Sequence, residues 1–240
     1  MDYNRRHPGP EYLDQIDLPD KDLFRNYREL HTVNRLLGGY RITLKGLSKF
    51  NSAEKNLTVL DAGCGGGDTL KAVVDWARNK KINCQLTGID LNNTAIQYAR
   101  ENCKDFPEIE FIHDDIFHHL STRNKYDVII SCLFMHHLSD EQIILLLSLM
   151  NESAELGILI NDLQRHPFAY QSIKFLTKCF SKSYLVKHDA PLSVLRGFSE
   201  DEWKQLFSKA FITTAEISWE WAFRYLVVYK KEQVNGFESI

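Results

Sequence analysis

The sequence predicts an α/β fold in which helices cover both faces of a mostly parallel β-sheet. From residue 57 onward, short apolar β-rich runs alternate with helical runs, a pattern typical of parallel sheets. The chain has 240 residues, of which 44% are hydrophobic, enough for one full hydrophobic core. In such sheets ligands bind beyond the carboxyl ends of the strands, and a polar residue follows each expected strand.

Five expected strands alternate with helices that have clear ends. The strands cover residues 57–62, 84–90, 109–115, 126–132 and 156–162. The first helix, residues 68–80, has apolar positions at helical spacing. Asn92 or Asn93 can cap the second helix, and Ser139 with Gln142 forms a capping-box pattern before the helix that follows the fourth strand.

Three further regions lie outside this alternation. Residues 1–55 are expected to form an N-terminal helical cap, and residues 56–240 the main domain. Residues 163–198 form an insertion after the fifth strand, and Ser199 with Glu202 predicts the start of the next helix. Two β-rich runs, residues 211–221 and 222–231, are expected to form a closing hairpin.

The stretch "VLDAGCGGGDTL", residues 59–70, places a glycine-rich loop between the first strand and helix. Glycine allows sharp turns and close approach of a ligand, and a following helix directs free amides at it. A dinucleotide loop would need glycine at position 68, where Asp68 stands, and a phosphate loop would need Gly-Lys-Ser/Thr. The observed spacing is instead Asp61, Gly63, Gly65 and Gly67.

This spacing resembles the S-adenosyl-L-methionine loop of class I methyltransferases. "GIDLN", "HDDIF" and "YDVIISCLFMHHL" are similar to the following cofactor segments of that family. The resemblance implies a Rossmann-like seven-stranded methyltransferase sheet, with S-adenosyl-L-methionine as cofactor and S-adenosyl-L-homocysteine as product. It also implies that Asp90 holds the ribose, that Asp115 and Ile116 contact adenine, and that Arg41 pairs with the methionine carboxylate. The remaining cofactor residues implied by the resemblance are Cys64, Leu91 and Ser131.

Three other segments narrow the resemblance. "RELHTVNRLLGGYR", "NDLQRHPFAY" and "KHDAPLSVLRGF" resemble bacterial small-molecule methyltransferases of phenolic, polyketide and quinone-like pathways. This resemblance implies a small aromatic or hydrophobic acceptor, methylated at a hydroxyl or at an activated ring carbon. A hydroxyl acceptor often needs a base, and histidine titrates near neutral pH. His166, just past the fifth strand, is the first candidate and His136 the second.

The insertion at residues 163–198 is expected to be a basic, amphipathic helical lid. Lys174, Lys178 and Lys182 recur at helical spacing, and Phe168, Ile173, Leu176 and Phe180 line another side. One interpretation is an ordinary surface helix with its apolar side against the core. The other is a lid over a hydrophobic acceptor, or a surface that meets an acidic carrier or a membrane.

Composition sets the remaining expectations. The five cysteines form no Cys-x-x-Cys pair, so neither disulfides nor a metal site is predicted. The net charge of -3 and the lack of an apolar leader favour a cytoplasmic protein that does not bind nucleic acid. A homodimer through the N-terminal helices is possible. The alternative functions are an RNA or protein methyltransferase and a non-catalytic cofactor-binding protein.

Overall fold

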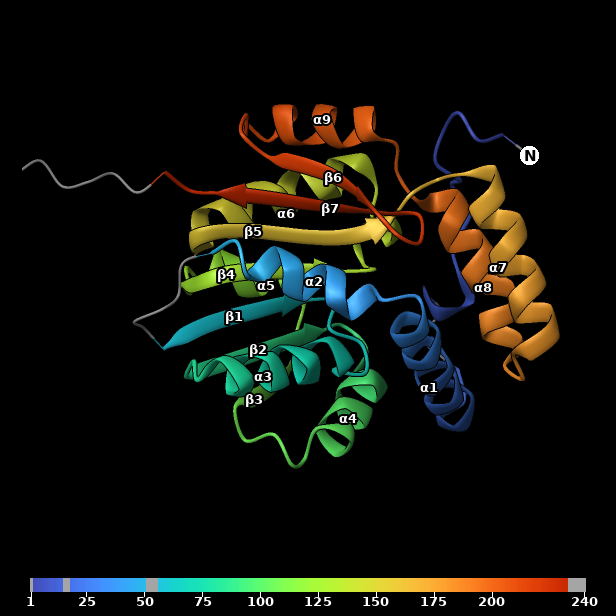
Figure 1. The fold of residues 1–240 in the computed structure, drawn as a ribbon, viewed down its shortest axis with the longest axis horizontal. Coiled ribbons are helices and arrows are strands. Elements are labelled where there is room, and N and C mark those ends of the chain that lie inside the picture. The colour runs from blue at the N-terminus through green and yellow to red at the C-terminus, as the bar shows by residue number, and fades with distance from the viewer. Residues whose placement is uncertain (1, 15–17, 51–55, 233–240) are drawn as a thin grey trace, which may run out of the picture.

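A computed structural model describes residues 2–14, 18–50 and 56–232, and these contain one seven-stranded sheet (Figure 1). The strand order is β3-β2-β1-β4-β5-β7-β6. The strands are β1 (Leu57–Ala62), β2 (Cys84–Asp90), β3 (Ile109–His113), β4 (Tyr126–Cys132), β5 (Ala154–Leu163), β6 (Glu216–Glu220) and β7 (Arg224–Lys230). The first five are parallel, and β7 runs antiparallel to both β5 and β6. The predicted closing hairpin is therefore present.

The order of the strands reverses beside β1, which pairs with β2 on one side and β4 on the other. Asp61 aligns with Gly88 of β2 and with Ile130 of β4. Chain connections leave in opposite directions from such a point, so space opens beyond the carboxyl ends of the strands. The predicted polar residues lie at this edge.

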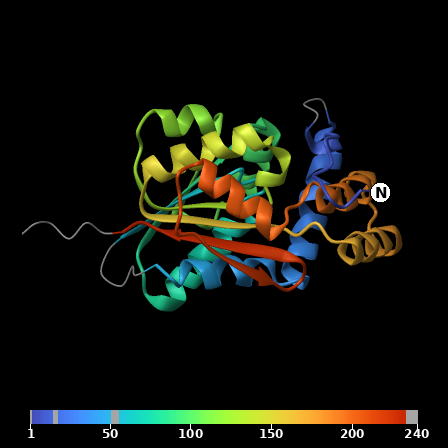
Figure 2. The same ribbon diagram turned by 90° about the horizontal axis from the view of Figure 1, so that it is seen from above.

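Helices cover both faces of the sheet, as predicted (Figure 2). One layer contains α2 (Gly39–Leu47), α3 (Asp68–Lys80) and α4 (Asn93–Asn102). The other contains α5 (Ile116–Ser121), α6 (Asp140–Ser153) and α9 (Glu200–Lys209). Asn92 caps α4, and both predicted capping boxes, at Ser139 and Ser199, are formed.

The expected N-terminal cap of residues 1–55 is divided between two places. A Cβ added at Gly46 of α2 would lie 2.4 Å from Leu159 of β5, so α2 packs directly on the sheet. Among the described residues of this region, residues 2–14 and α1 (Asp20–Leu36) lie beyond the strand ends. The predicted cap region therefore also supplies a helix, α2, to one layer of the sheet.

The insertion forms two helices, α7 (Pro167–Phe180) and α8 (Tyr184–Arg196), which pack together beside α1 at the right of Figure 1. The interpretation in which Phe168 and Phe180 of α7 face the core is wrong, and the alternative of a lid or a docking surface stays a prediction. Phe168 and Phe180 are 62% and 78% exposed, whereas Ala169, Tyr170 and Thr177 are buried. Packing against neighbouring elements therefore determines which side of α7 is buried, and its large apolar side chains remain exposed to solvent. No described helix is long and apolar enough to cross a membrane.

Candidate active site

The glycine loop between β1 and α3 is held by its backbone. Gly63, Gly65 and Gly67 have φ angles of 73°, 50° and 79°, in the left-handed region that favours glycine. The amide of Gly63 donates to the carbonyl of Ile89 at 2.9 Å, and that of Gly65 donates to Asp90 Oδ2 at 2.9 Å. Beside Gly65, the nearest atom to an added Cβ is 3.9 Å away, on Tyr27, so the loop leaves space there.

Two buried acids follow β1 and β2. Asp90 Oδ1 accepts from the amide of Asn92 at 2.9 Å, so this carboxylate ties the loop to the end of β2. Asp61 is 1% exposed and its Oδ1 has no hydrogen-bond partner. The buried hydroxyl of Ser131 also lacks a hydrogen-bond partner. Burial raises the pKa of Asp61 well above its ordinary value, and burial also raises the pKa of Asp90. Unpartnered buried atoms at a glycine loop fit a polar ligand.

The residues expected at the adenine are less enclosed. Asp115 is exposed and caps α5, because its Oδ1 accepts from the amide of Phe117 at 2.7 Å. Ile116 is buried, whereas the side chain of Leu91 is 69% exposed. Cys64 is buried in the loop, and burial raises the pKa of its thiol.

Helix α1 covers the glycine loop, which the sequence did not reveal. Tyr27 lies over Gly65, and burial together with the nearby Asp90 raises the pKa of its phenol. His31, one turn later, pairs with Asp68 at 3.1 Å. The i, i+4 spacing of these two aromatic residues was the available signal.

Arg41 does not lie in a buried anion site. It is exposed on α2, beside Gly38. The buried cation here is Arg224 at the start of β7, which is 3% exposed, with no hydrogen-bond partner at Nε or Nη1. Burial lowers the pKa of this guanidinium, and the nearby Asp162 opposes that shift. A buried guanidinium with free donors is suited to hold a carboxylate.

His136 lies at the carboxyl ends of β4 and β5, in the short helix η2 (Met135–His137). Its Nδ1 donates to Asp162 Oδ1 at 2.7 Å, and both side chains are buried. Burial alone would raise the pKa of Asp162, but the charge and hydrogen bond of His136 hold that pKa below its usual value. An ionised carboxylate therefore fixes the tautomer and orientation of the ring.

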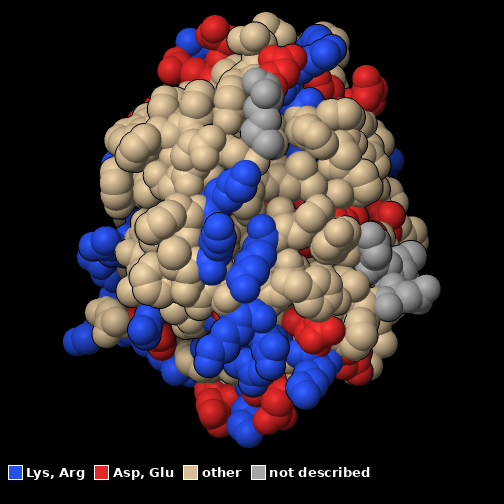
Figure 3. All heavy atoms as spheres, turned by 90° about the vertical axis from the view of Figure 1, so that its right-hand side faces the viewer, with Lys and Arg blue, Asp and Glu red and all other residues tan. Residues whose placement is uncertain are grey.

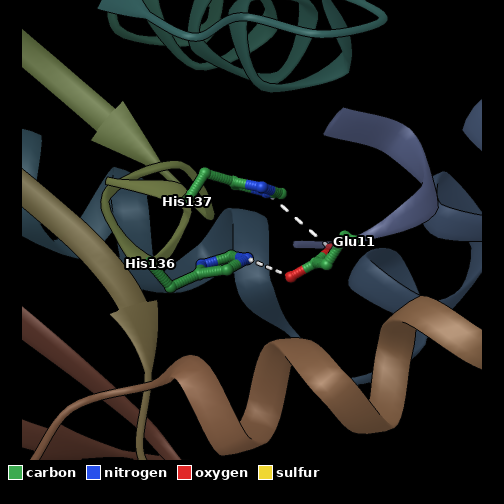
Figure 4. Close-up of side chains that lie close together, drawn as sticks. All are labelled: Glu11, His136 and His137. Carbon is green, nitrogen blue, oxygen red and sulfur yellow. Dashed lines mark ion pairs between the residues drawn. The ribbon is translucent and has the colours of Figure 1, made fainter. Parts of the chain in front are cut away.

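Glu11 reaches the same place from the N-terminal segment, where η1 (Tyr12–Asp14) begins directly after it. Its Oε1 lies 3.7 Å from His136 Nε2, and its Oε2 lies 4.0 Å from His137 Nε2 (Figure 4). Glu11 is 2% exposed, and burial raises its pKa to about 7. His137 Nδ1 donates to Asp14 Oδ1 at 2.7 Å.

Helix α8 fixes this cluster in place. The guanidinium of Arg196 donates to the carbonyls of His136 and His137 at 2.9 and 2.8 Å, and to that of Gly9 at 2.7 Å. Asp189 accepts from the amides of Tyr12 and Leu13 at 2.9 and 3.0 Å. The N-terminal segment is thereby joined to the strand ends.

The other candidate histidines serve local structure. His166 is the N-cap of α7, its Nδ1 accepts from the amide of Phe168 at 3.2 Å, and its ring stacks on Phe223. His188 donates to Asp189 at 2.7 Å and stacks on Tyr12. Of the two predicted bases, His166 and His136, it is His136 that pairs with a buried carboxylate.

The sheet order, the glycine loop and the acid at the end of β2 define a class I S-adenosyl-L-methionine-dependent methyltransferase. The glycine cradle and the unpartnered atoms of Asp61 and Ser131 fit this cofactor. The chain belongs to the methyltransferase domain family, whose sequence profile matches residues 53–210. It is therefore an enzyme of the methyltransferase class. No curated protein sequence matches the chain significantly.

Solved structures share the fold at low identity. The plantazolicin methyltransferase BpumL, solved with S-adenosyl-L-homocysteine, is 20% identical with a TM-score of 0.63, over 90% of this chain and 91% of that chain. Human N-acetylserotonin methyltransferase, solved with S-adenosyl-L-methionine, is 18% identical with a TM-score of 0.63, over 92% and 62%. Magnesium protoporphyrin IX methyltransferase from Synechocystis is 13% identical with a TM-score of 0.54, over 91% and 100%.

Proposed function

We propose that this enzyme transfers a methyl group from S-adenosyl-L-methionine to a hydroxyl group of a small aromatic or hydrophobic acceptor, of which phenols are typical. The observation that carries the proposal is the buried His136–Asp162 pair at the strand ends, where Asp162 holds the ring at 2.7 Å. A base beside an acceptor hydroxyl directly generates an oxygen nucleophile, so the pair supports oxygen as the atom that is methylated.

The cofactor half of the site is assigned to the loop and its neighbours. Asp90 is placed to accept from the ribose hydroxyls, and the space beside Gly65 admits a ligand close to the backbone. Arg224 is proposed to hold the methionine carboxylate in place of Arg41, because its free donors are buried. When bound, the cofactor supplies an electrophilic methyl group on a sulfonium centre.

The acceptor half is assigned to the His136 cluster. With Nδ1 committed to Asp162, the Nε2 lone pair of His136 is free to accept the proton of an acceptor hydroxyl. Asp162 stabilises the resulting imidazolium, and burial of both side chains keeps water away. His166 is then a positioning residue for α7 rather than the base.

A small acceptor fits the cap better than RNA or a protein. Helices α1, α7 and α8 lie across the strand ends, and the net charge of -3 gives no overall attraction for nucleic acid. The structures with this fold include enzymes named for plantazolicin, N-acetylserotonin and magnesium protoporphyrin IX, none of them a nucleic acid. These likenesses support a low-molecular-weight acceptor.

The exposed face of α7 is proposed to meet an anionic membrane surface that delivers a hydrophobic acceptor. Phe168 and Phe175 are 62% and 65% exposed, and Lys174, Lys178 and Lys182 are exposed as well. Figure 3 shows Lys and Arg side chains gathered in the middle of this end of the molecule. Bulky apolar groups beside lysines suit the interface of an anionic bilayer.

Vesicle sedimentation tests this surface. The wild type should pellet with vesicles that contain phosphatidylserine, and a Lys174→Glu, Lys178→Glu, Lys182→Glu variant should stay in the supernatant. Equal behaviour of the two proteins contradicts the membrane proposal, and retention on an acidic carrier protein alone would assign the face to that partner.

The function itself is tested with labelled S-adenosyl-L-methionine and an extract of the source organism. After reaction, the extract is separated into organic-soluble, nucleic-acid and protein fractions. We expect label in the organic fraction, and expect it to disappear with His136→Asn. Label in RNA or protein contradicts the proposal. Label that persists with His136→Asn contradicts the role of the histidine.

A further inference from the structure

We infer that Glu11, His136 and His137 bind one divalent transition-metal ion, with Zn²⁺ as the representative of its chemical class. One ligand atom from each residue lies within 4.8 Å of the others. Both imidazoles point toward the carboxylate in Figure 4. Two histidines and one carboxylate are a known ligand set for a zinc site with an open position.

The hydrogen bonds of the two rings leave the ligand atoms free. A carboxylate can only accept, so Asp162 and Asp14 each require a proton on Nδ1 of the ring they contact, at 2.7 Å. The nitrogen that faces Glu11 is then Nε2, whose lone pair is available when the ring carries only the Nδ1 proton. Carboxylates that orient histidines in this way are the usual outer partners of metal-bound histidines.

The distances suit a bridging ion better than direct hydrogen bonds. Oε1 of Glu11 is 3.7 Å from His136 Nε2, and Oε2 is 4.0 Å from His137 Nε2, both too long for a hydrogen bond. Two ligands at zinc bond lengths and a tetrahedral angle are about 3.4 Å apart. The three ligand atoms lie within 4.8 Å of one another, so the side chains would have to move inward by up to about 1.4 Å to bind one ion.

Burial and charge give a second, independent argument. Glu11 is 2% exposed, and its Oε1 has no hydrogen-bond partner, although it points into the cluster. Asp14 and Asp189 add negative charge around it, and the guanidinium of Arg196 lies 3.9 Å from its Oε1. A buried carboxylate oxygen without a hydrogen bond is costly, and a cation bound between it and the imidazoles would satisfy it.

The N-terminal segment is held firmly enough to supply a ligand. Asp189 accepts hydrogen bonds from the two backbone amides directly after Glu11. Arg196 donates to the carbonyl of Gly9 and to the carbonyls of the two histidines. The three ligands are therefore positioned by one helix, α8. This arrangement resembles a built site more than a chance meeting of side chains.

The ion changes the role proposed for His136, and this part of the inference rests on the proposed function. One lone pair serves one partner, so His136 cannot both bind the ion and accept a proton at Nε2. Three protein ligands would leave a position open for the acceptor oxygen, and the ion would favour the deprotonated oxygen, with the hydroxyl proton released to bulk solvent as the acceptor enters. In metal-free protein, His136 remains the base.

The test measures metal binding by the full chain, without activity as the readout. Protein stripped with a chelator is titrated with Zn²⁺ against a chromogenic chelator, and with Co²⁺ by absorption spectroscopy. We expect one equivalent to bind. Glu11→Gln and His137→Asn should each weaken binding by more than the roughly 10- to 100-fold typical of an outer partner, and Asp14→Asn by an amount within that range.

His118→Asn is the matched control, because His118 also contacts a carboxylate through Nδ1, Asp114 at 3.0 Å, but is 70% exposed and lies on α5. It should bind Zn²⁺ as the wild type does. Lack of saturable binding by folded wild type overturns the inference, as does binding that Glu11→Gln and His137→Asn leave unchanged.

The outcomes separate the metal from the proposed function. Methyl transfer that persists after chelation and is lost with His136→Asn supports the histidine base and removes the catalytic role of the ion. Metal binding without transfer to any small molecule contradicts the proposed function and leaves the metal site in place.

Discussion

The two halves of the active site are built in different ways. The proposed cofactor half is made mainly from one continuous loop, Asp61 to Gly67, and the end of the neighbouring strand at Asp90, with Arg224 added from β7. The acceptor half joins Glu11, His136 and Asp162, which come from three distant parts of the chain. The first is therefore encoded in a short sequence pattern, and the second exists only after the cap has folded onto the strand ends.

The difference also concerns which atoms act. In the loop, backbone amides and the lack of Cβ atoms shape the site, so residue spacing is informative. In the acceptor half, side chains are oriented by other side chains, such as Arg196 and Asp189. Five substitutions, from the largest expected effect to the smallest, test whether the halves act separately.

The largest effect is expected from His136→Asn. Asparagine keeps a donor toward Asp162 but removes Nε2, so methyl transfer should fall about 100- to 10,000-fold. The affinity for S-adenosyl-L-methionine should not change, because the loop is untouched. Single-turnover transfer and calorimetric titration measure the two quantities. A parallel loss of cofactor affinity would show that the halves are coupled.

Gly65→Ala and Gly67→Ala compare two positions of the same loop. A Cβ at Gly65 meets open space, whereas at Gly67 it would lie 2.7 Å from Phe111. Gly65→Ala should therefore weaken cofactor binding about 5- to 150-fold, a cost of about 1–3 kcal/mol for crowding the ligand. Gly67→Ala should lower the free energy of unfolding more than Gly65→Ala does. Denaturant unfolding and cofactor titration distinguish them, and the reverse ranking would refute the assignment of the open space.

Asp189→Asn tests the support of the acceptor half. The amides of Tyr12 and Leu13 would lose a charged acceptor, which should cost about 1–2 kcal/mol of local stability. Hydrogen exchange at these two amides should become faster, and the KM for the acceptor should rise while cofactor affinity stays constant. Unchanged exchange would mean that the segment is held by other contacts.

Asp61→Asn is expected to have the smallest effect. The test is whether the free energy of unfolding of the variant, relative to the wild type, rises or falls with pH. Burial raises the folded-state pKa of Asp61 above the ordinary value of 3.8, so the folded state holds this proton more tightly than the unfolded state does. The wild type should lose free energy of unfolding as pH rises above 3.8 and through the folded-state pKa. Asn cannot ionise, so the variant should become relatively more stable with rising pH, while its cofactor binding weakens. Urea unfolding across this pH range checks the slope, and parallel curves would contradict it.

The sequence predicted much of the fold because its signals are local. Alternating apolar runs gave the sheet and its helices, and the capping boxes at Ser139 and Ser199 gave helix starts that the structure confirms. The buried side of α7 was not predictable, because Phe168 and Thr177 are sorted by contact with neighbouring helices rather than by hydropathy.

The sequence by itself determined the class of fold, the glycine loop and the acids that follow β1 and β2, because each depends on residues close together in the chain. Only the tertiary structure decided that His136 has a carboxylate partner, that His166 caps a helix, and that Glu11 meets the two histidines. Those contacts depend on where α8 and the N-terminal segment pack. The spacing of residues along the chain does not determine the distance between segments that are far apart in the sequence.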